Sequence, residues 1–138
     1  MRAVWIIASF LTVVIAIASC QTAEDIEFKR YYTAGLVEYQ NHCQNCHGDK
    51  GQGLAALIPP LTDTAYISRN KNMLACLLSK GIKGKITVAG KEFDSEMPPA
   101  ELAPMEIAQV LTYVGNSFGN KVGLISNDDV TRDLKNCR

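Results

Sequence analysis

The residues best suited to chemistry are Cys43, Cys46 and His47, which follow one another in the pattern Cys-x-x-Cys-His. On a helical turn, positions i, i+3 and i+4 share one face, so two thiols and an imidazole would converge on one planar group. This spacing is the attachment signature of c-type haem. It predicts one covalent haem c, with thioether bonds from Cys43 and Cys46 and with His47 as an axial ligand of the iron.

Two other chemistries use the same residue types. A Cys-x-x-Cys pair can be a redox dithiol, and His47 could complete a zinc site together with thiolates. A zinc site would need a second cluster of ligands, whereas the only other histidine is His42, next to Cys43. A thioredoxin-like dithiol usually follows a β-strand, and no strand is predicted before Cys43. Haem attachment is therefore the favoured interpretation of the motif.

An iron bound by one histidine has an opposite coordination site, whose occupant separates electron transfer from catalysis. Met97 lies in the sequence Glu-Met-Pro-Pro, where the prolines restrict the backbone and prevent a helix from starting at once. Met73 fits the apolar stripe of a predicted helix, which favours core packing, and Met105 falls in a first helical turn, which favours packing or a surface position. We therefore expect Met97 to be the second axial ligand. The alternatives are Met105, an open iron or one bound by His42.

The N-terminus carries signals of export. An apolar run over residues 3–17 follows a basic start at Arg2, as in a secretory signal peptide, and is short for a membrane span. The sequence Ile-Ala-Ser-Cys that ends it resembles the lipobox of bacterial lipoproteins, which predicts a lipoprotein signal peptide over residues 1–19 and lipidation of Cys20. Residues 20–28 are expected to form a lipid-anchored tether, with the protein on the periplasmic side of a bacterial membrane. Ordinary cleavage near Ser19 with a soluble product is the alternative.

Two cysteines remain once lipid and haem are assigned. They are Cys76 and Cys137, and an even remainder in an exported protein permits a disulfide between them. The alternative is a buried free thiol at Cys76, because this residue lies inside an apolar helical pattern.

The rest of the chain predicts the elements that position these residues. Helical periodicity covers residues 29–41, 70–80 and 104–118, and a capping box at Ser126 predicts a short last helix. Two short β-branched runs predict a small hairpin just before Met97. Gly35 lies inside the first helix at a cost of about 1 kcal/mol relative to alanine, so another backbone or ring is expected to pack closely against it. The prediction is an all-α domain over residues 29–138, with about four to five helices around the haem.

These residues together resemble the class I monohaem cytochromes c. The resemblance extends from about residue 31 to residue 118 and rests on Gly35, Tyr39, Cys43, Cys46, His47, Pro59, Leu61, Met97 and Tyr113. It implies the cytochrome c fold, in which the C-terminal helix crosses the N-terminal helix at Gly35, with Val110 and Tyr113 in contact. It also implies that the Pro59 carbonyl accepts the Nδ1 proton of His47 and so orients the ring.

The later half of the chain is similar to the cytochrome domains that accompany copper nitrite reductases and quinoprotein dehydrogenases. One departure from the family pattern is Ala103, which stands where such helices usually have a serine or threonine cap. This difference is expected to weaken the start of the helix slightly.

A haem iron closed by His47 and Met97 implies an electron-transfer protein and not an enzyme, with other redox proteins as donor and acceptor. One alternative is a haem subunit or docking module of a respiratory oxidase, reductase or dehydrogenase complex. The other alternative is an open-site haem enzyme or sensor. It would need a distal acid–base residue, and only His42 is available, which lies beside the proximal motif.

The charges of the chain are balanced, with 14 basic and 14 acidic residues and no long run of one sign. Nothing in this balance predicts binding to nucleic acid. Lys80, Lys83, Lys85 and Lys91 lie near the segment expected to border the haem and could steer an acidic partner. The alternative is an ordinary solvated face, because acidic residues at 92, 94 and 96 alternate with them.

Overall fold

The computed structural model describes Trp5 and residues 22–137. The elements in this part of the chain are α2 (Ala23–His42), α3 (Gln44–His47), α4 (Thr64–Arg69), the 3₁₀ turn η1 (Lys71–Met73), α5 (Leu74–Lys80), β1 (Ile86–Val88), β2 (Lys91–Phe93), α6 (Pro104–Val114) and α7 (Asn127–Lys135). The expected all-α fold with one small hairpin is confirmed. Apart from Trp5, the predicted signal peptide lies outside the described residues, as does Cys20.

The long helix α2 begins at Ala23, six residues before the predicted start, so most of the expected tether is helical. Thr22 caps the helix: its Oγ1 accepts from the Asp25 N–H at 3.2 Å, and the Asp25 carboxylate accepts from the Thr22 N–H at 3.3 Å. Such reciprocal bonds satisfy two backbone groups that would otherwise lack partners. The predicted helix start at residue 29 was wrong because the acidic, polar stretch before it was taken for non-helical chain.

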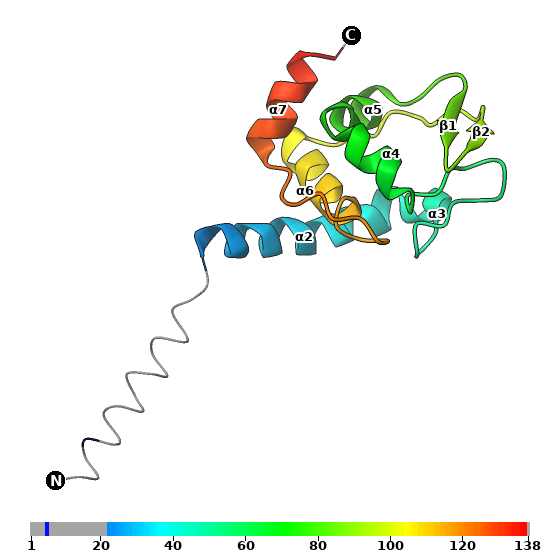
Figure 1. The fold of residues 1–138 in the computed structure, drawn as a ribbon. Coiled ribbons are helices and arrows are strands. Elements are labelled where there is room, and N and C mark those ends of the chain that lie inside the picture. Colours follow the sequence, from blue (N-terminus) through cyan, green and yellow to red (C-terminus); the bar gives the residue numbers. More distant parts are fainter. Residues whose placement is uncertain (1–4, 6–21, 138) are drawn as a thin grey trace.

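The helices α2 and α6 cross in close contact and form the main packing unit of the fold (Figure 1). Gly35 lies at the crossing, where a Cβ atom would stand 2.0 Å from the carbonyl oxygen of Gln109. Tyr39 and Val110, each 1% exposed, are buried beside it, and Tyr113 contacts the ring of Tyr39. The crossing expected at Gly35 is therefore confirmed, and the need for close backbone approach explains a glycine inside the helix.

The predicted helix over residues 70–80 is instead the 3₁₀ turn η1 followed by the helix α5, and the short helix α4, which was not predicted, precedes them. Asp63 caps α4 by accepting from the N–H groups of Ala65 and Tyr66, both at 3.1 Å. At the end of α4, the Asn70 side chain donates to the Tyr66 carbonyl at 2.8 Å, in addition to the Asn70 backbone N–H at 3.1 Å. The expectation of core packing for Met73 was wrong: it lies in η1 and is 52% exposed.

The hairpin formed by β1 and β2 leans on α4. Its turn residues Ala89 and Gly90 both have positive φ values, of 50° and 73°, and this conformation is costly for alanine. The Asp63 carboxylate accepts from the Ala89 N–H at 2.8 Å and thereby ties the turn to the N-terminus of α4. Val88 and Phe93 are buried, so a two-stranded unit that would be marginal alone is stabilised by the body of the domain.

The helix α6 ends at Val114, four residues before the predicted end. Side chains of Asn116 and Asn120 donate to the carbonyls of Thr112 and Val114, which supplies the last turn with partners. At its start, the Ala103 N–H donates to Glu106 at 2.7 Å, and alanine offers no side-chain oxygen in return.

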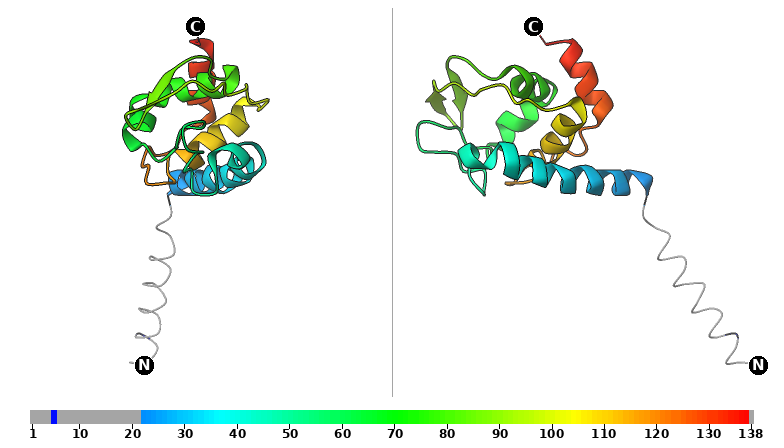
Figure 2. Two further views of the ribbon diagram at one scale, coloured as in Figure 1. Left: turned by 90° about the vertical axis from the view of Figure 1, so that its right-hand side faces the viewer. Right: turned by 180° about the vertical axis from the view of Figure 1, so that it is seen from behind.

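The helix α7 packs across α6 on the side opposite α2 (Figure 2). Ser126 caps it as predicted, with its Oγ 3.1 Å from the Asp129 N–H. Val130 is fully buried against the core. Within the described residues, no helix has the length and apolar character needed to cross a membrane.

Candidate functional site

The three motif residues lie on one helical turn that continues from α2. The Cys43 N–H donates to the Tyr39 carbonyl at 2.9 Å, and the His47 N–H donates to the Cys43 carbonyl at 2.9 Å. Cys43, at the junction of α2 and α3, and Cys46 and His47, within α3, all line a common cavity. The convergence expected from their spacing is present in the structure.

The His47 ring is held by the backbone of Pro59. Its Nδ1 lies 3.1 Å from the Pro59 carbonyl oxygen, and His47 itself is only 9% exposed. Because a carbonyl can only accept, Nδ1 carries the proton, and Nε2 is left with its lone pair available to a metal. Burial lowers the pKa of His47 below its ordinary value, against the opposing effect of the Pro59 hydrogen bond, so the ring is neutral at pH 7.

The loop that presents Pro59 depends on a glycine at position 53. A Cβ there would lie 2.3 Å from the Ile58 carbonyl oxygen and 2.8 Å from the carbonyl carbon of Pro59, and φ is +69°. The Gly53 N–H also donates to the His47 carbonyl at 2.8 Å. The chain can therefore fold back on His47 only if residue 53 has no side chain.

Met97 reaches the same cavity from a different part of the chain. Its backbone N–H and carbonyl both pair with Ile82, at 3.0 and 2.9 Å. Gly81 makes this pairing sterically accessible, because a Cβ there would lie 2.3 Å from the Met97 carbonyl oxygen. The prolines after Met97 are therefore not its only constraint, and the role of Gly81, whose φ is positive, becomes visible only in the tertiary structure.

The cavity between these segments has a volume of about 490 Å³. Its walls are largely apolar side chains from α4, α5, α6 and the hairpin; prominent among them are Ile67, Leu74, Leu77, Val88, Val110 and Leu111. Of the described methionines, Met97 lines the cavity, whereas Met73 and Met105 are 52% and 42% exposed at the surface. A cavity of this size and polarity is suited to a large apolar ligand with a few polar attachment points.

The surroundings of the Cys43 thiol disfavour a redox dithiol. Burial, with smaller contributions from Cys46 and Glu38, raises the pKa of the Cys43 thiol to about 11. Reactive dithiols need a thiol whose pKa is lowered toward neutrality, and the surroundings of Cys43 act in the opposite direction. The donor set and the apolar walls instead fit a covalently attached haem, with thiol sulfurs for its edge and imidazole and thioether for its iron.

The two remaining cysteines are joined. Cys76 on α5 and Cys137 after α7 form a disulfide that spans 61 positions of sequence. Sequence reasoning left this pairing open, because the distance between the two Cα atoms, 5.6 Å here, depends on how α5 and α7 pack.

One residue important to the site was overlooked. Asp63 caps α4 and binds the hairpin turn, and both of these elements line the cavity. Its position just before a helix would have been a readable capping signal, but its contact with Ala89 would not.

Comparison with known proteins agrees with this geometry. The family model described as cytochrome c matches residues 33–117. Cytochrome c-552 of Thermus thermophilus is 30% identical over 83 residues, which cover 56% of this chain and 63% of that protein. The cytochrome c subunit of alcohol dehydrogenase (quinone) from Gluconacetobacter polyoxogenes is 27% identical over 103 residues, which cover 71% of this chain and 22% of that subunit. The chain thus spans less than two thirds of the length of either relative.

Proposed function

The chain belongs to the cytochrome c family, and we propose that it is a one-electron carrier with a single haem c, attached through Cys43 and Cys46 and ligated by His47 and Met97. When bound, an iron with these two ligands exchanges one electron at a raised reduction potential and makes no bond to a substrate.

The observation that carries the proposal is that both candidate ligands line one apolar cavity and are both immobilised by backbone hydrogen bonds. Pro59 holds the ring of His47, and Ile82 holds the backbone of Met97 on both sides. Ligands held in place by their surroundings need little rearrangement when the charge of the site changes. The apolar walls further disfavour the more charged oxidised state and so contribute to a high reduction potential.

A pair of variants tests the assignment of the axial methionine. The oxidised protein should show the weak thioether-to-iron charge-transfer absorption band. Met97→Ala should lose it, and Met105→Ala should keep it because Met105 lies at the surface. An unchanged band in Met97→Ala would show that the assignment is wrong.

We further propose that the protein is exported and held at the periplasmic side of a bacterial membrane by acyl chains on Cys20. The support is the apolar run and lipobox-like sequence at the N-terminus. Mass measurement of the native protein tests it, since acyl chains on a Cys20 N-terminus would add a defined mass that is lost in Cys20→Ser. A mass equal to the unmodified polypeptide plus haem would rule it out.

A second candidate function is a haem subunit within a dehydrogenase complex, favoured by the similarity to the cytochrome c subunit of alcohol dehydrogenase (quinone). The lysines near the cavity give this candidate little independent support. Lys83 lies 3.2 Å from Glu96, and Lys85 lies 3.6 Å from Glu92, so their charges are offset in exposed pairs. Purification under mild conditions separates the two functions: a carrier elutes alone, and a subunit elutes with a dehydrogenase.

A further inference from the structure

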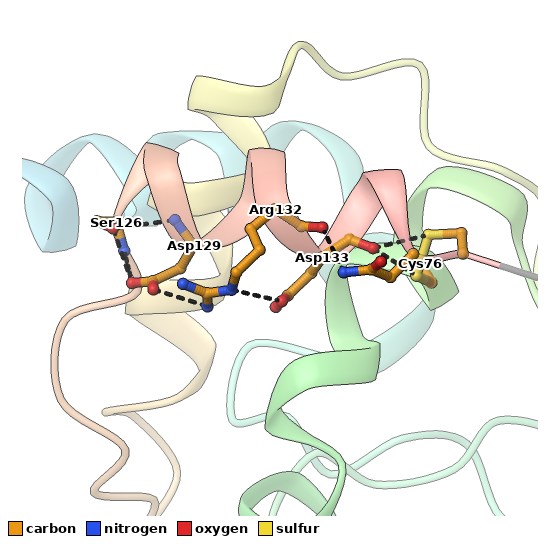
Figure 3. A network of polar contacts seen from close by, with 7 residues as sticks. Cys76, Ser126, Asp129, Arg132 and Asp133 are labelled. Atoms are coloured by element: carbon orange, nitrogen blue, oxygen red, sulfur yellow. Dashed lines mark hydrogen bonds and ion pairs between the residues drawn. A yellow bond between two sulfur atoms is a disulfide. The ribbon is translucent and has the colours of Figure 1, made fainter.

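The Cys76–Cys137 disulfide connects the chain after the C-terminal helix α7 to α5 (Figure 3). Other residues of α5 form part of the cavity wall. Cys76 is buried in α5, and Cys137 follows the end of α7. Both sulfur atoms lie 3.5 Å from the Asp133 carbonyl oxygen, a packing contact since disulfide sulfurs carry no proton. The bond thus joins α5 to the last turn of α7.

The helix α5 in turn supports the segment that contains Met97. The Leu78 carbonyl accepts from the Ala100 N–H at 2.8 Å, three residues after Met97. Only Gly81 separates the end of α5 from Ile82, which pairs with Met97 on both its N–H and its carbonyl. The Met97 segment is therefore attached to the C-terminal end of α5 at two points, one on each side of Pro98 and Pro99.

The position of α5 depends on its contacts with the rest of the domain. The helix is seven residues long, and no side chain caps its N-terminus. A helix this short is unstable on its own and depends on tertiary contacts for its position. Leu74 and Ala75 are buried in the core, and Leu77 and Leu78 face the cavity. The disulfide supplies the covalent contact on the side away from the cavity.

The helix α7, at the other end of the disulfide, has a capped N-terminus and one side chain buried in the core. Ser126 and Asp129 form a capping box, and Arg132 pairs with Asp129 at 2.8 Å and with Asp133 at 3.5 Å (Figure 3). Val130 is 0% exposed in the core. The disulfide therefore adds a covalent tie between α7 and α5 to the contacts that already position α5.

We propose that Cys76 and Cys137 are positioning residues for the axial methionine: their disulfide holds α5, and α5 holds Met97 in the cavity. The inference rests on the proposed role of Met97 as a haem ligand. It adds that the strength of this ligation depends on a covalent bond outside the cavity.

The test uses the holoprotein and imidazole as an external ligand that competes with the methionine in the oxidised state. The double variant Cys76→Ala with Cys137→Ala opens the tie without leaving reactive thiols. Val130→Ala is the matched control, because it weakens the packing of α7 and keeps the disulfide. If the Met97 segment opens more often, apparent imidazole affinity should rise by about tenfold in the double variant, because this affinity scales with the population of the open state. In Val130→Ala it should change by less than about twofold.

Equal affinity in the wild type and the double variant, or an equal rise in Val130→Ala, would overturn the inference, since the disulfide would then act only on overall stability. If the charge-transfer band of the wild-type protein were still present in the Met97→Ala variant, the proposed ligand and the inference would both be overturned. The first result leaves the methionine assignment standing, so the two failures are distinguishable.

A second measurement, on the wild-type protein, tests the inference if the double variant does not fold. Dithiothreitol, a dithiol, transfers two electrons and two protons to the disulfide of the folded wild-type protein and leaves two thiols. Carbon monoxide binding to the reduced haem then reports on displacement of Met97. Binding about tenfold faster after dithiol treatment supports the inference, and an unchanged rate in protein shown by thiol labelling to be fully reduced at Cys76 and Cys137 contradicts it.

Discussion

Substituting Gly35 with alanine perturbs the crossing of α2 and α6 with a single methyl group. The added Cβ would lie 2.0 Å from the Gln109 carbonyl oxygen and 2.9 Å from the Cβ of Tyr113. Both neighbours belong to α6, and one of them is backbone, so no side-chain rotation relieves the clash. The two helices must separate.

The magnitude follows from the distance. Ordinary contact begins near 3.4 Å, so α6 must move by about 1.4 Å in this direction. Overpacking of a core costs about 1–3 kcal/mol, and a gap of this size forfeits a large part of the dispersion energy around Tyr39 and Val110. Alanine returns about 1 kcal/mol through its higher helix propensity. We expect Gly35→Ala to lower the free energy of unfolding by about 2 kcal/mol, the upper end of the overpacking cost less the gain in helix propensity.

Guanidinium chloride unfolding of the holoprotein, followed by far-ultraviolet circular dichroism, measures this change. The matched control is Thr33→Ala, at an exposed position of the same helix, which should be neutral or stabilising by up to about 0.5 kcal/mol. If Gly35→Ala were more stable than the wild type by about 1 kcal/mol, helix propensity alone would account for it and the close-approach argument would fail.

Three further predictions concern the supports of the site. Asp63→Asn keeps a capping oxygen for α4 and loses the second acceptor for Ala89, so stability should fall by about 1 kcal/mol at pH 7 in denaturant titrations. Hydrogen bonds from backbone N–H groups, chiefly that of Ala89, hold the pKa of Asp63 below its ordinary value of 3.8. The stability that the Asp63 carboxylate contributes is therefore complete above pH 3.8 and is lost as the pH falls through the lower pKa of the folded state. A stability difference between variant and wild type that widened on acidification would contradict this sign. Thr112→Val should lower the free energy of unfolding by about 2–3 kcal/mol, because it leaves the buried N–H and carbonyl of Ile125 without their hydrogen-bond partner at 3.1 Å. Thr112→Ser should keep both hydrogen bonds, so equal losses of stability in the two variants would refute this explanation. Lys83→Glu combined with Lys85→Glu should slow oxidation by an anionic iron complex about fivefold at low salt and not at 0.5 M salt, in stopped-flow absorbance; a rate independent of salt and of charge would remove electrostatic steering from this face.

The parts of the structure that could be predicted are those determined by short spacings. The Cys-x-x-Cys-His turn, the Ser126 capping box and the close packing at Gly35 each follow from residues within one element. The early start of α2 was also readable, because Thr22 and Asp25 form a capping signal, but the acidic composition of the stretch concealed it. The residue types and short spacings within one element were therefore sufficient to predict these features.

The parts that could not be predicted depend on contacts between distant segments. The exposure of Met73 goes with its place in the 3₁₀ turn between α4 and α5, which an apolar stripe does not reveal. The requirement for glycine at 53 and 81 appears only once Pro59 and Met97 are placed beside them. The disulfide likewise depends on how α5 meets α7, which no periodicity in the sequence encodes.

A redox titration at pH 7, with and without carbon monoxide, tests the central claim most directly. A site closed by His47 and Met97 should titrate as a single one-electron couple whose midpoint carbon monoxide leaves within about 10 mV. An open site would bind carbon monoxide in the reduced state, and the midpoint would rise by about 59 mV for every tenfold excess over the dissociation constant. A rise of about 100 mV or more in the wild-type protein would contradict the closed, electron-carrying site proposed for this chain.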